Sequence, residues 1–263
     1  MATPRCAVIT GAAQGIGRRT AEAFGRAGFS LALVDVREPE DTLAALHALG
    51  VESIARVGDI TDDRVVEAFA RDTHDRFGVA DVLVNNAGIA FISPAERTSA
   101  ADYRRVLDVN LVAPFLLAKA FGARMLEAGR GSVVNVASVA GLMGVTDRVA
   151  YNASKHGLIG LTRTLAAEWG GRGVRVNAVC PGWVKTEMDV ASQSGGHYTD
   201  RDIIGRVPMG RFATADDVAN AILFLADDAR SAFVNGATLA VDGGWTADGS
   251  WESLRLSHRS TPA

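Results

Sequence analysis

The chain has 263 residues, of which 48% are hydrophobic and 22% are charged, and its formal net charge is −3. This composition is ordinary for a globular protein with a sizeable core, and the length allows a single large α/β domain. A small negative net charge provides no global basic field for nucleic acid or an anionic membrane. We therefore expect neither of these as a partner.

The sequence features that bear on cellular location are the N-terminal residues, the longest apolar runs and the two cysteines. The N-terminal residues lack the apolar core of a signal peptide, and no apolar run approaches the roughly 18 residues that a membrane span requires. The two cysteines, Cys6 and Cys180, lie inside apolar runs. We therefore expect buried free thiols rather than a disulfide or a metal site, in a cytoplasmic protein.

Short apolar runs alternate along the chain with longer helical patterns. Strands are predicted at Ala7–Thr10, Leu31–Asp35, Ser53–Val57, Val82–Asn85, Ser132–Ala137, Arg175–Cys180 and Thr238–Val241. Helices are predicted near Ile16–Ala27, Thr42–Leu49, Asp63–Phe77, Ala101–Glu127, Ala150–Gly170 and Ala215–Leu225. Nearly continuous apolar strands are typical of strands covered on both faces. The alternation predicts an α/β fold, a doubly wound parallel sheet with helices on both faces, in one domain over residues 1–244.

Two polar segments interrupt this rhythm. Residues 183–210 form a long segment without a clear pattern, and a loop of that length is usually functional, so we predict a lid over the substrate. Residues 245–263 follow the last strand. Two interpretations of this tail stay open: a disordered terminus, or docking of Trp251 and Leu254 on a neighbouring subunit.

A glycine-rich loop, Thr10-Gly11-Ala12-Ala13-Gln14-Gly15-Ile16-Gly17, separates the first strand from the first helix. Glycines at this place permit a tight turn and let the backbone approach a pyrophosphate. The following helix N-terminus offers unpaired N–H donors and a positive dipole end to that phosphate. Alone, such a loop is weak evidence, since a plain βα turn looks similar.

Residues at the ends of the next strands strengthen a dinucleotide interpretation. Asp35 ends the second strand, where its carboxylate can accept hydrogen bonds from the adenosine ribose and repel a 2′-phosphate, which favours NAD over NADP. Asp59 and Ile60 follow the third strand, where the carboxylate can meet the adenine amino group. The segment Asn85-Asn86-Ala87-Gly88 ends the fourth, and its small and amide side chains suit a flat ligand crossing the strand ends.

Tyr151 and Lys155 stand four residues apart in the helix after the fifth predicted strand. That spacing places both side chains on one helix face. A neighbouring ammonium stabilises a phenolate, so we expect the pKa of Tyr151 to be lowered. Such a tyrosine can take the proton from an alcohol as hydride leaves, or return it to a carbonyl. The pair by itself is frequent by chance.

Ser138 and Asn110 strengthen the catalytic interpretation of Tyr151 and Lys155. Ser138 ends the fifth strand, on the same rim as the glycine loop, and can hydrogen-bond the substrate oxygen. Asn110 lies in an apolar helix, where a buried amide needs partners; we expect a bridging water to Lys155, although a purely structural amide is an equal alternative. After the sixth strand, Pro181-Gly182-Trp183-Val184-Lys185-Thr186 is predicted to begin a loop over the nicotinamide, with Val184 and Thr186 reaching its carboxamide.

Together these residues closely resemble the short-chain dehydrogenase/reductase family in its compact form. The resemblance rests on Thr-Gly-x-x-x-Gly-Ile-Gly, on Asn-Asn-Ala-Gly, on the tetrad of Asn110, Ser138, Tyr151 and Lys155, and on Pro-Gly before Val184 and Thr186. It extends from the first strand through Asp242-Gly243-Gly244. It implies a seven-stranded Rossmann-type sheet, the tetrad roles given above, and a homotetramer in which the helices bearing Asn110 and Tyr151 form one interface.

The resulting expectation is an NAD-dependent oxidoreductase acting on a small secondary alcohol such as a polyol or sugar. The predicted cofactor residues are Gly11, Gln14, Gly15, Ile16, Gly17, Asp35, Asp59, Ile60, Asn86, Ala87, Gly88, Tyr151, Lys155, Pro181, Gly182, Val184 and Thr186. The predicted substrate contacts are Ser138, Tyr151, Phe91, Met143 and Trp183. Two alternatives stay open: a 3-oxoacyl carrier-protein reductase docking its acidic partner on Arg124, Arg130 and Arg172, and a non-catalytic dinucleotide sensor.

Overall fold

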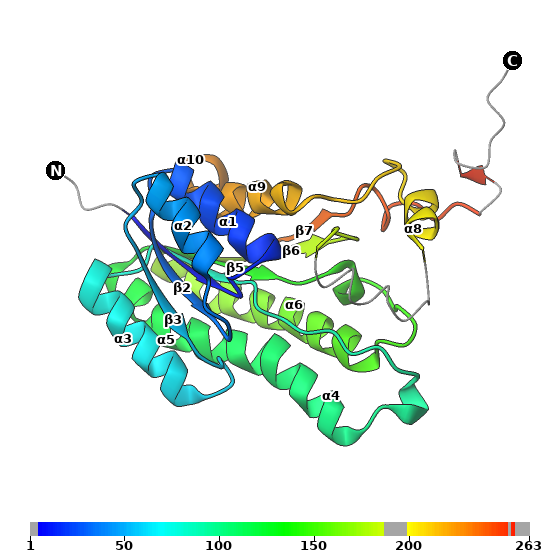
Figure 1. The fold of residues 1–263 in the computed structure, drawn as a ribbon, viewed down its shortest axis with the longest axis horizontal. Helices are drawn as coiled ribbons and strands as arrows, with labels where there is room; N and C mark the ends of the chain where they lie inside the picture. The colour runs from blue at the N-terminus through cyan, green and yellow to red at the C-terminus, as the bar shows by residue number, and fades with distance from the viewer. Residues whose placement is uncertain (1–4, 187–198, 252–253, 256–263) are drawn as a thin grey trace, which may run out of the picture.

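A parallel sheet forms the centre of the molecule (Figure 1). The computed structural model describes residues 5–186, 199–251 and 254–255, and in this part of the chain seven parallel strands pair in the order β3-β2-β1-β4-β5-β6-β7. Their bounds are β1 Cys6–Thr10, β2 Ser30–Asp35, β3 Ser53–Val57, β4 Val82–Asn85, β5 Gly131–Val136, β6 Val174–Pro181 and β7 Thr238–Val241. The predicted seven-stranded parallel sheet is confirmed.

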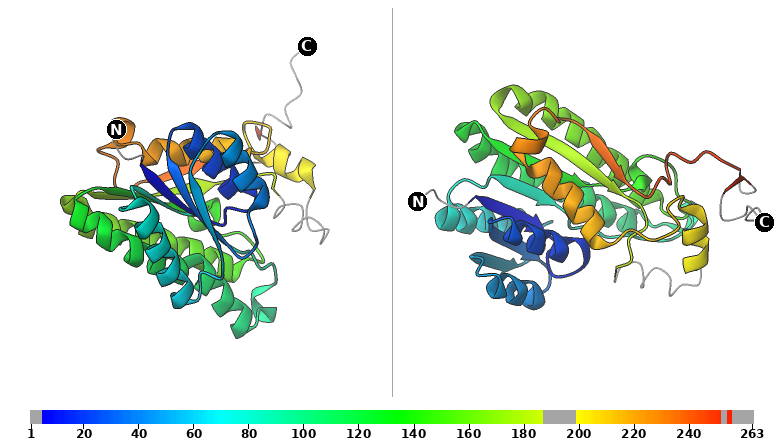
Figure 2. Two further views of the ribbon diagram at one scale, coloured as in Figure 1. Left: turned by 60° about the vertical axis from the view of Figure 1, so that its left-hand side comes forward. Right: turned by 90° about the horizontal axis from the view of Figure 1, so that it is seen from above.

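Helices cover both faces of the sheet, as predicted (Figures 1 and 2). One face carries α1 Gly15–Arg26, α2 Glu40–Ala48 and α9 Ala215–Ala226. The other carries α3 Asp63–Phe77, α5 Ala113–Ala128 and α6 Val149–Trp169. The remaining α-helices of the described chain are α4 Ala100–Leu107, α8 Asp200–Arg206 and α10 Asp228–Ser231.

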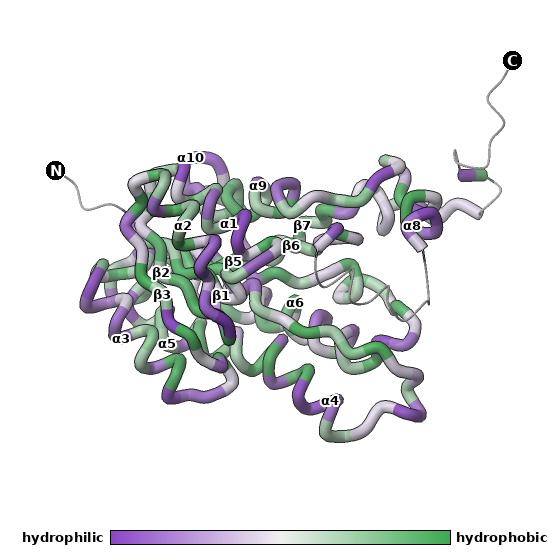
Figure 3. Tube along the Cα trace, viewed as in Figure 1, coloured by the Kyte–Doolittle hydropathy of each residue, from purple (hydrophilic) through white to green (hydrophobic). Residues whose placement is uncertain are grey.

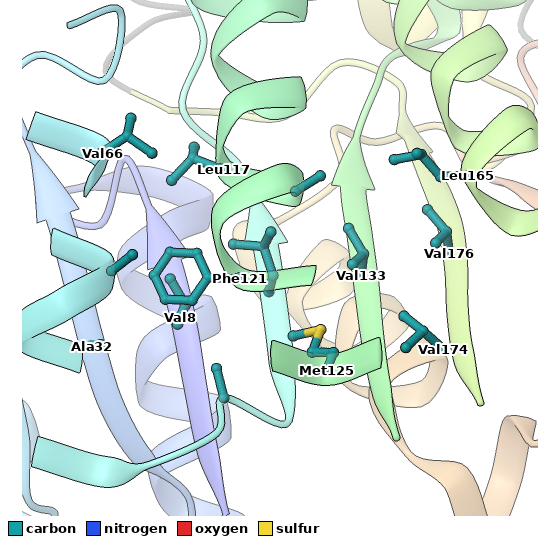
Figure 4. Packing of buried hydrophobic residues seen from close by; sticks show 14 of the residues in the cluster. Val8, Ala32, Val66, Leu117, Phe121, Met125, Val133, Leu165, Val174 and Val176 are labelled. Atoms are coloured by element: carbon teal, nitrogen blue, oxygen red, sulfur yellow. The ribbon is translucent and has the colours of Figure 1, made fainter. Parts of the chain in front are cut away.

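The strands separate two hydrophobic cores because successive side chains of a strand point to opposite faces. In β1, Val8 belongs to the core under α3 and α5, whereas Ile9 belongs to the core under α1 and α9. Figure 4 shows the first core, in which Phe121 of α5 lies over Val8 and Leu117 lies beside Val66. Hydropathy along the trace follows this division, with hydrophobic strands inside and hydrophilic turns outside (Figure 3).

The order of the strands places a crevice at one edge of the sheet. From β1 the chain builds outward to β2 and β3, and then returns to β4 on the other side of β1. The segments that leave β1 and β4 therefore diverge at the carboxyl ends of the strands. This reversal point is where open α/β sheets bind their ligands.

The helix predicted over Ala101–Glu127 is continuous but not regular. Asp108–Val112 forms a π-helical turn between α4 and α5, and the N–H of Ala113 donates to the carbonyl of Asp108, five residues back. Pro114 explains the wide turn, since it lacks the N–H that an α-helix would donate to the carbonyl of Asn110. The extra residue changes the helix face on which Asn110 lies.

Two expectations need correction. Part of the predicted lid, residues 183–210, is helical: α8 begins with a capping box in which Thr199 and Asp202 satisfy each other's backbone N–H groups. Residues 187–198 of the lid lie outside the described residues. The stretch Ala100–Ala128 is long and apolar enough to cross a membrane, contrary to the sequence estimate. However, Leu117, Phe121 and Met125 of this stretch are fully buried in the core of the fold.

Candidate active site

A cavity of about 520 Å³ lies at the carboxyl ends of the strands. The predicted cofactor residues line it with one exception, Gly17, and Ser138 and Trp183 line it as well. Asn110 does not reach the cavity surface. One continuous space therefore joins Asp35, the glycine loop and the Tyr151–Lys155 pair, as a ligand of dinucleotide length requires.

The glycine loop is held from the end of β4. The side chain of Asn86 donates to the carbonyls of Thr10 (2.9 Å) and Gly11 (3.0 Å), while the Thr10 hydroxyl accepts the backbone N–H groups of Asn86 and Ala87. Gly11 has a φ of +65°, and a Cβ there would lie 2.8 Å from the Cα of Ala87. The backbone is therefore bare where a pyrophosphate would pass, and the residues present fit a dinucleotide.

Gly17 does not line the cavity because it lies beneath the glycine loop. A Cβ on Gly17 would lie 2.0 Å from the carbonyl oxygen of Gly11 and 2.6 Å from Nδ2 of Asn86. That oxygen is already fixed by Asn86, so the loop cannot move away without breaking the hydrogen bond.

We expect Gly17→Ala to displace the loop and to raise the dissociation constant for the dinucleotide by about 100-fold, since a 1 Å misplacement has effects of that order. Calorimetric titration with NAD measures it. Gly160→Ala in α6 is the matched control, because nothing lies within 4 Å of a Cβ at that position. An unchanged affinity in Gly17→Ala would contradict the packing argument.

Asp35 is held firmly at the cavity mouth. Its Oδ2 accepts the N–H of Ala13 in the glycine loop (2.9 Å), and its Oδ1 accepts the N–H of Arg37 (3.0 Å). The residue is only 8% exposed. Further along the wall, Asp59 accepts from the N–H and hydroxyl of Thr61, and Ile60 is buried beside it. Each carboxylate keeps acceptor capacity for a ligand hydroxyl or amine.

Asn110 is fully buried, and its amide has three partners. Its Oδ1 accepts the N–H of Ile89 (2.9 Å), and its Nδ2 donates to the carbonyl of Ile89 (2.9 Å) and to the Ser154 hydroxyl (3.1 Å). The amide thus ties the π-helical turn to the segment after β4 and to α6. The expected water link to Lys155 stays a prediction.

Lys155 is a buried cation. Its side chain is 3% exposed, and Nζ donates to the carbonyl of Val136 at the end of β5 (2.8 Å). Loss of solvation lowers the pKa of Lys155 to about 8, against a smaller opposite effect of Cys180. Nζ lies 5.6 Å from the centre of the Tyr151 ring, so the two side chains share a helix face as the spacing predicted.

The pKa of Tyr151 runs against the expectation from the sequence. Loss of solvation raises it, whereas a hydrogen bond with Ser138 and the positive charge of Arg148 act to lower it. Lys155 is not among these influences. Ser138 is itself fixed, because its Oγ accepts the N–H of Ala140 (3.1 Å). In the protein alone the phenol therefore keeps its proton through the neutral range.

The loop after β6 forms the opposite wall. Gly182 donates its N–H to the carbonyl of Val241 (3.0 Å), and a Cβ there would lie 2.9 Å from the Cα of Asp242. Val184 pairs with Ala213 in an isolated bridge. Pro181, Gly182, Val184 and Thr186 all line the cavity, and their contact with a nicotinamide stays a prediction.

The predicted substrate contacts are only partly brought together. Ser138, Tyr151 and Trp183 line the cavity, whereas Phe91 and Met143 do not. Ser93 donates its N–H to the carbonyl of Asp147 (2.8 Å), which joins the two loops that carry Phe91 and Met143. Ala90, Val145 and Arg148 of these joined loops line the cavity.

Several residues that shape the site had no role in the sequence interpretation. Thr10 begins the glycine-rich loop and Ser154 precedes Lys155. Their hydrogen bonds to the segment after β4 and to Asn110 become visible only in the folded structure. Thr42 donates to the carbonyl of Ala12 (2.7 Å) and braces the glycine loop from α2. Asp147, next to the wall residue Arg148, has a φ of +58°, a left-handed conformation that aspartate adopts more readily than most non-glycine residues.

Comparison with known proteins agrees with this geometry. The family model described as enoyl-(acyl carrier protein) reductase matches residues 11–246. D-threitol dehydrogenase of Mycolicibacterium smegmatis is 44% identical over 247 residues, covering 92% of this chain and 93% of that protein. Galactitol 2-dehydrogenase (L-tagatose-forming) of Cereibacter sphaeroides is 41% identical over 244 residues, covering 92% and 94%.

A solved structure gives the same result for the fold. It is of a protein from Beutenbergia cavernae assigned as an NAD(P)-dependent gluconate 5-dehydrogenase, with NADP bound at low occupancy. It superimposes with a TM-score of 0.87 at 41% identity, covering 93% of this chain and 97% of that one. The chain therefore belongs to the short-chain dehydrogenase/reductase family and is an oxidoreductase of the alcohol dehydrogenase and ketone reductase type.

Proposed function

We propose that this protein is an NAD-dependent dehydrogenase of a polyol, sugar or similar secondary alcohol, with Tyr151 as general acid and base. The observation that carries the proposal is the single cavity that joins Asp35 to Ser138, Tyr151 and Lys155. The threitol and galactitol dehydrogenases among its relatives support the substrate class.

The chemistry follows from the positions of these side chains. A bound nicotinamide supplies the hydride acceptor. Ser138 hydrogen-bonds the substrate oxygen and holds it beside the phenol. Tyr151 takes the hydroxyl proton during oxidation and returns it during reduction. The Lys155 ammonium lies on the same helix face and is the cation available to the phenolate once it forms. Asn110 positions the loop after β4 and α6 relative to each other.

The choice of NAD rests on Asp35. Its carboxylate is fixed at the cavity mouth by Ala13 and Arg37, where it favours ribose hydroxyls and repels a 2′-phosphate. NADP in the Beutenbergia structure argues for the other cofactor, so the preference needs a direct measurement.

We expect Asp35→Ala to lower the ratio of NAD to NADP affinity by about tenfold or more, because a hydrogen bond to a charged group contributes about 1.5–3 kcal/mol. Calorimetric dissociation constants for both dinucleotides measure the ratio. Asp75→Ala on the exposed side of α3 removes the same charge far from the cavity and should leave the ratio unchanged. A constant ratio in Asp35→Ala would refute the ribose contact.

The activity itself is tested by absorbance of the reduced nicotinamide, with NAD and NADP tried separately against polyols, sugars and other secondary alcohols. Turnover of one such class with NAD supports the proposal. Turnover of acyl thioesters alone would favour the carrier-protein reductase, and dinucleotide binding without any turnover would favour the sensor. Arg130, one of the three arginines suggested for carrier-protein docking, is paired with Asp81 (3.1 Å), which weakens that alternative.

We further propose a cytoplasmic homotetramer. Phe115 (45% exposed) and Val112 (43%) lie on the helical stretch that carries Asn110, and Val149 (38%) lies at the start of the helix that carries Tyr151. Large apolar side chains that are exposed on these two helices favour burial against another subunit. Trp251 and Leu254 of the tail are also exposed, and residues 252–253 and 256–263 lie outside the described residues.

A further inference from the structure

Four side chains from distant parts of the sequence form a continuous stack at the edge of the cavity. The Trp183 and Trp245 rings lie 5.6 Å apart between centroids, at an interplanar angle of 28°. The guanidinium carbon of Arg148 lies 5.4 Å from the Trp183 centroid, and that of Arg206 lies 5.4 Å from the Trp245 centroid. We refer to Arg148, Trp183, Trp245 and Arg206 as the tryptophan stack.

The backbone around the stack explains why the two rings meet. The N–H of Ala213 donates to the carbonyl of Trp183 (2.9 Å), and this hydrogen bond fixes the loop after β6. Asp242 closes the turn after β7 by accepting from Gly244 and from Thr246. The two neighbouring turns thus present Trp183 and Trp245 to each other, and the segment after β7 lies beside α8 in Figures 1 and 2.

The outer end of the stack is anchored by charge. Arg206 donates to the Asp248 carboxylate (3.2 Å) and to the Asp248 carbonyl (3.1 Å), and Arg255 lies 3.5 Å from the same carboxylate. The Arg206 and Asp248 side chains are 22% and 15% exposed, so solvent screens the pair only in part. Arg206 is therefore restrained over the Trp245 ring.

The inner end of the stack reaches the reacting groups. Arg148 and Trp183 line the cavity, whereas Trp245 and Arg206 do not. Arg148 lies three residues before Tyr151, at the beginning of α6, and its charge acts on the phenol. An indole wall suits the C–H groups of an alcohol chain, and its orientation decides how much of that chain it contacts.

We propose that Trp245 and Arg206 are positioning residues that hold the Trp183 indole as the substrate wall of the cavity, and so set the affinity for the alcohol. This inference rests on the proposed alcohol dehydrogenase function. It assigns the substrate dependence of the enzyme partly to Trp245 in the segment after β7 and to Arg206 in α8, neither of which lines the cavity.

The test compares Trp245→Ala with Trp245→Phe. Removing the ring should raise the KM for the best alcohol about three- to tenfold, the range that corresponds to the free energy of an aromatic pair. The kcat and the dinucleotide dissociation constant should stay within about twofold. Phenylalanine keeps a flat ring and should restore most of the affinity, and Arg206→Ala should act in the same direction as Trp245→Ala. Phe233→Ala, at a fully exposed aromatic residue that does not line the cavity, is the matched control.

Circular dichroism in the tryptophan bands gives a readout apart from activity. The close, nearly parallel rings should produce a coupled signal that Trp183→Ala and Trp245→Ala abolish and Trp251→Ala keeps. An active wild type whose alcohol KM is unchanged in Trp245→Ala would overturn the inference and leave the function intact. Equal losses in kcat and dinucleotide affinity would also overturn it, since they indicate general disruption. A wild type that turns over no alcohol would overturn the function, and the inference with it.

Discussion

Replacing Tyr151 with phenylalanine should lower kcat for alcohol oxidation by about 10³-fold, within the range that general acid–base catalysis contributes. The substitution removes one hydroxyl and keeps the ring beside which Lys155 lies. Binding of the dinucleotide should change little, because the glycine loop and Asp35 are untouched. Steady-state kinetics measure the first effect, and calorimetry with NAD measures the second.

The chain offers a matched control in Tyr103. This residue lies in α4 and does not line the cavity, so Tyr103→Phe makes the same chemical change away from the reacting groups and should keep kcat. If Tyr151→Phe retained turnover, the proton would have to move through another group, and the proposed role would be refuted. A parallel loss in Tyr103→Phe would instead point to a general effect of phenol removal on the fold.

Most of the fold was predictable because local sequence and tertiary structure agree. The strands at Ser53–Val57, Val82–Asn85 and Thr238–Val241 have the bounds predicted for them, since short runs rich in apolar and β-branched residues between turn signals leave few alternatives. The capping box at Thr199 and Asp202 was a readable signal for α8, but it was lost inside a long polar segment. The π-helical turn required attention to Pro114 within an otherwise helical pattern.

The residues of the candidate site also divide into those that could be predicted from the sequence and those that could not. Motif residues at strand ends were predictable because parallel strands bring all their carboxyl ends to one edge. Phe91 and Met143 do not line the cavity, since loop paths depend on contacts such as that of Ser93 with Asp147, and their contact with a substrate stays a prediction. The stacking of Trp183 on Trp245 joins two turns through tertiary packing alone, and no local pattern encodes it. The direction of the Tyr151 pKa was missed because burial, which sequence does not quantify, outweighs the charges around it.

Replacing Lys155 with methionine should abolish efficient turnover and yet make the protein without cofactor more stable at pH 7. In the folded state the pKa of Lys155 is lowered from its usual 10.5 to about 8 by loss of solvation. Since one pKa unit corresponds to about 1.4 kcal/mol, the buried ammonium costs about 3 kcal/mol of unfolding free energy below pH 8. Methionine fills a similar volume without a charge to desolvate.

Part of this gain is offset by the carbonyl of Val136, which loses the hydrogen bond from Nζ at a cost of about 1 kcal/mol. A net gain of about 2 kcal/mol corresponds to a rise of about 5 °C in the unfolding temperature for a chain of this size. Arg71→Met on the exposed side of α3 replaces a solvated cation with methionine away from the proposed subunit interface, and should leave the temperature nearly unchanged.

The cause of the difference in unfolding temperature between wild type and Lys155→Met is identified by its pH dependence. Because the folded pKa is the lower one, the folded protein releases the Lys155 proton first as the pH rises from about 8 toward 10.5, and the penalty disappears over that range. The unfolding temperatures of wild type and Lys155→Met should therefore converge at high pH. The buried thiols Cys6 and Cys180, whose pKa values are raised to about 12 and about 11, destabilise both proteins above pH 9 and largely cancel in the difference. The ammonium would be solvated or paired if Lys155→Met had a lower unfolding temperature than wild type at pH 7, or if the two temperatures did not converge at high pH. Convergence would mean that this enzyme gives up stability to keep a cation beside its catalytic phenol.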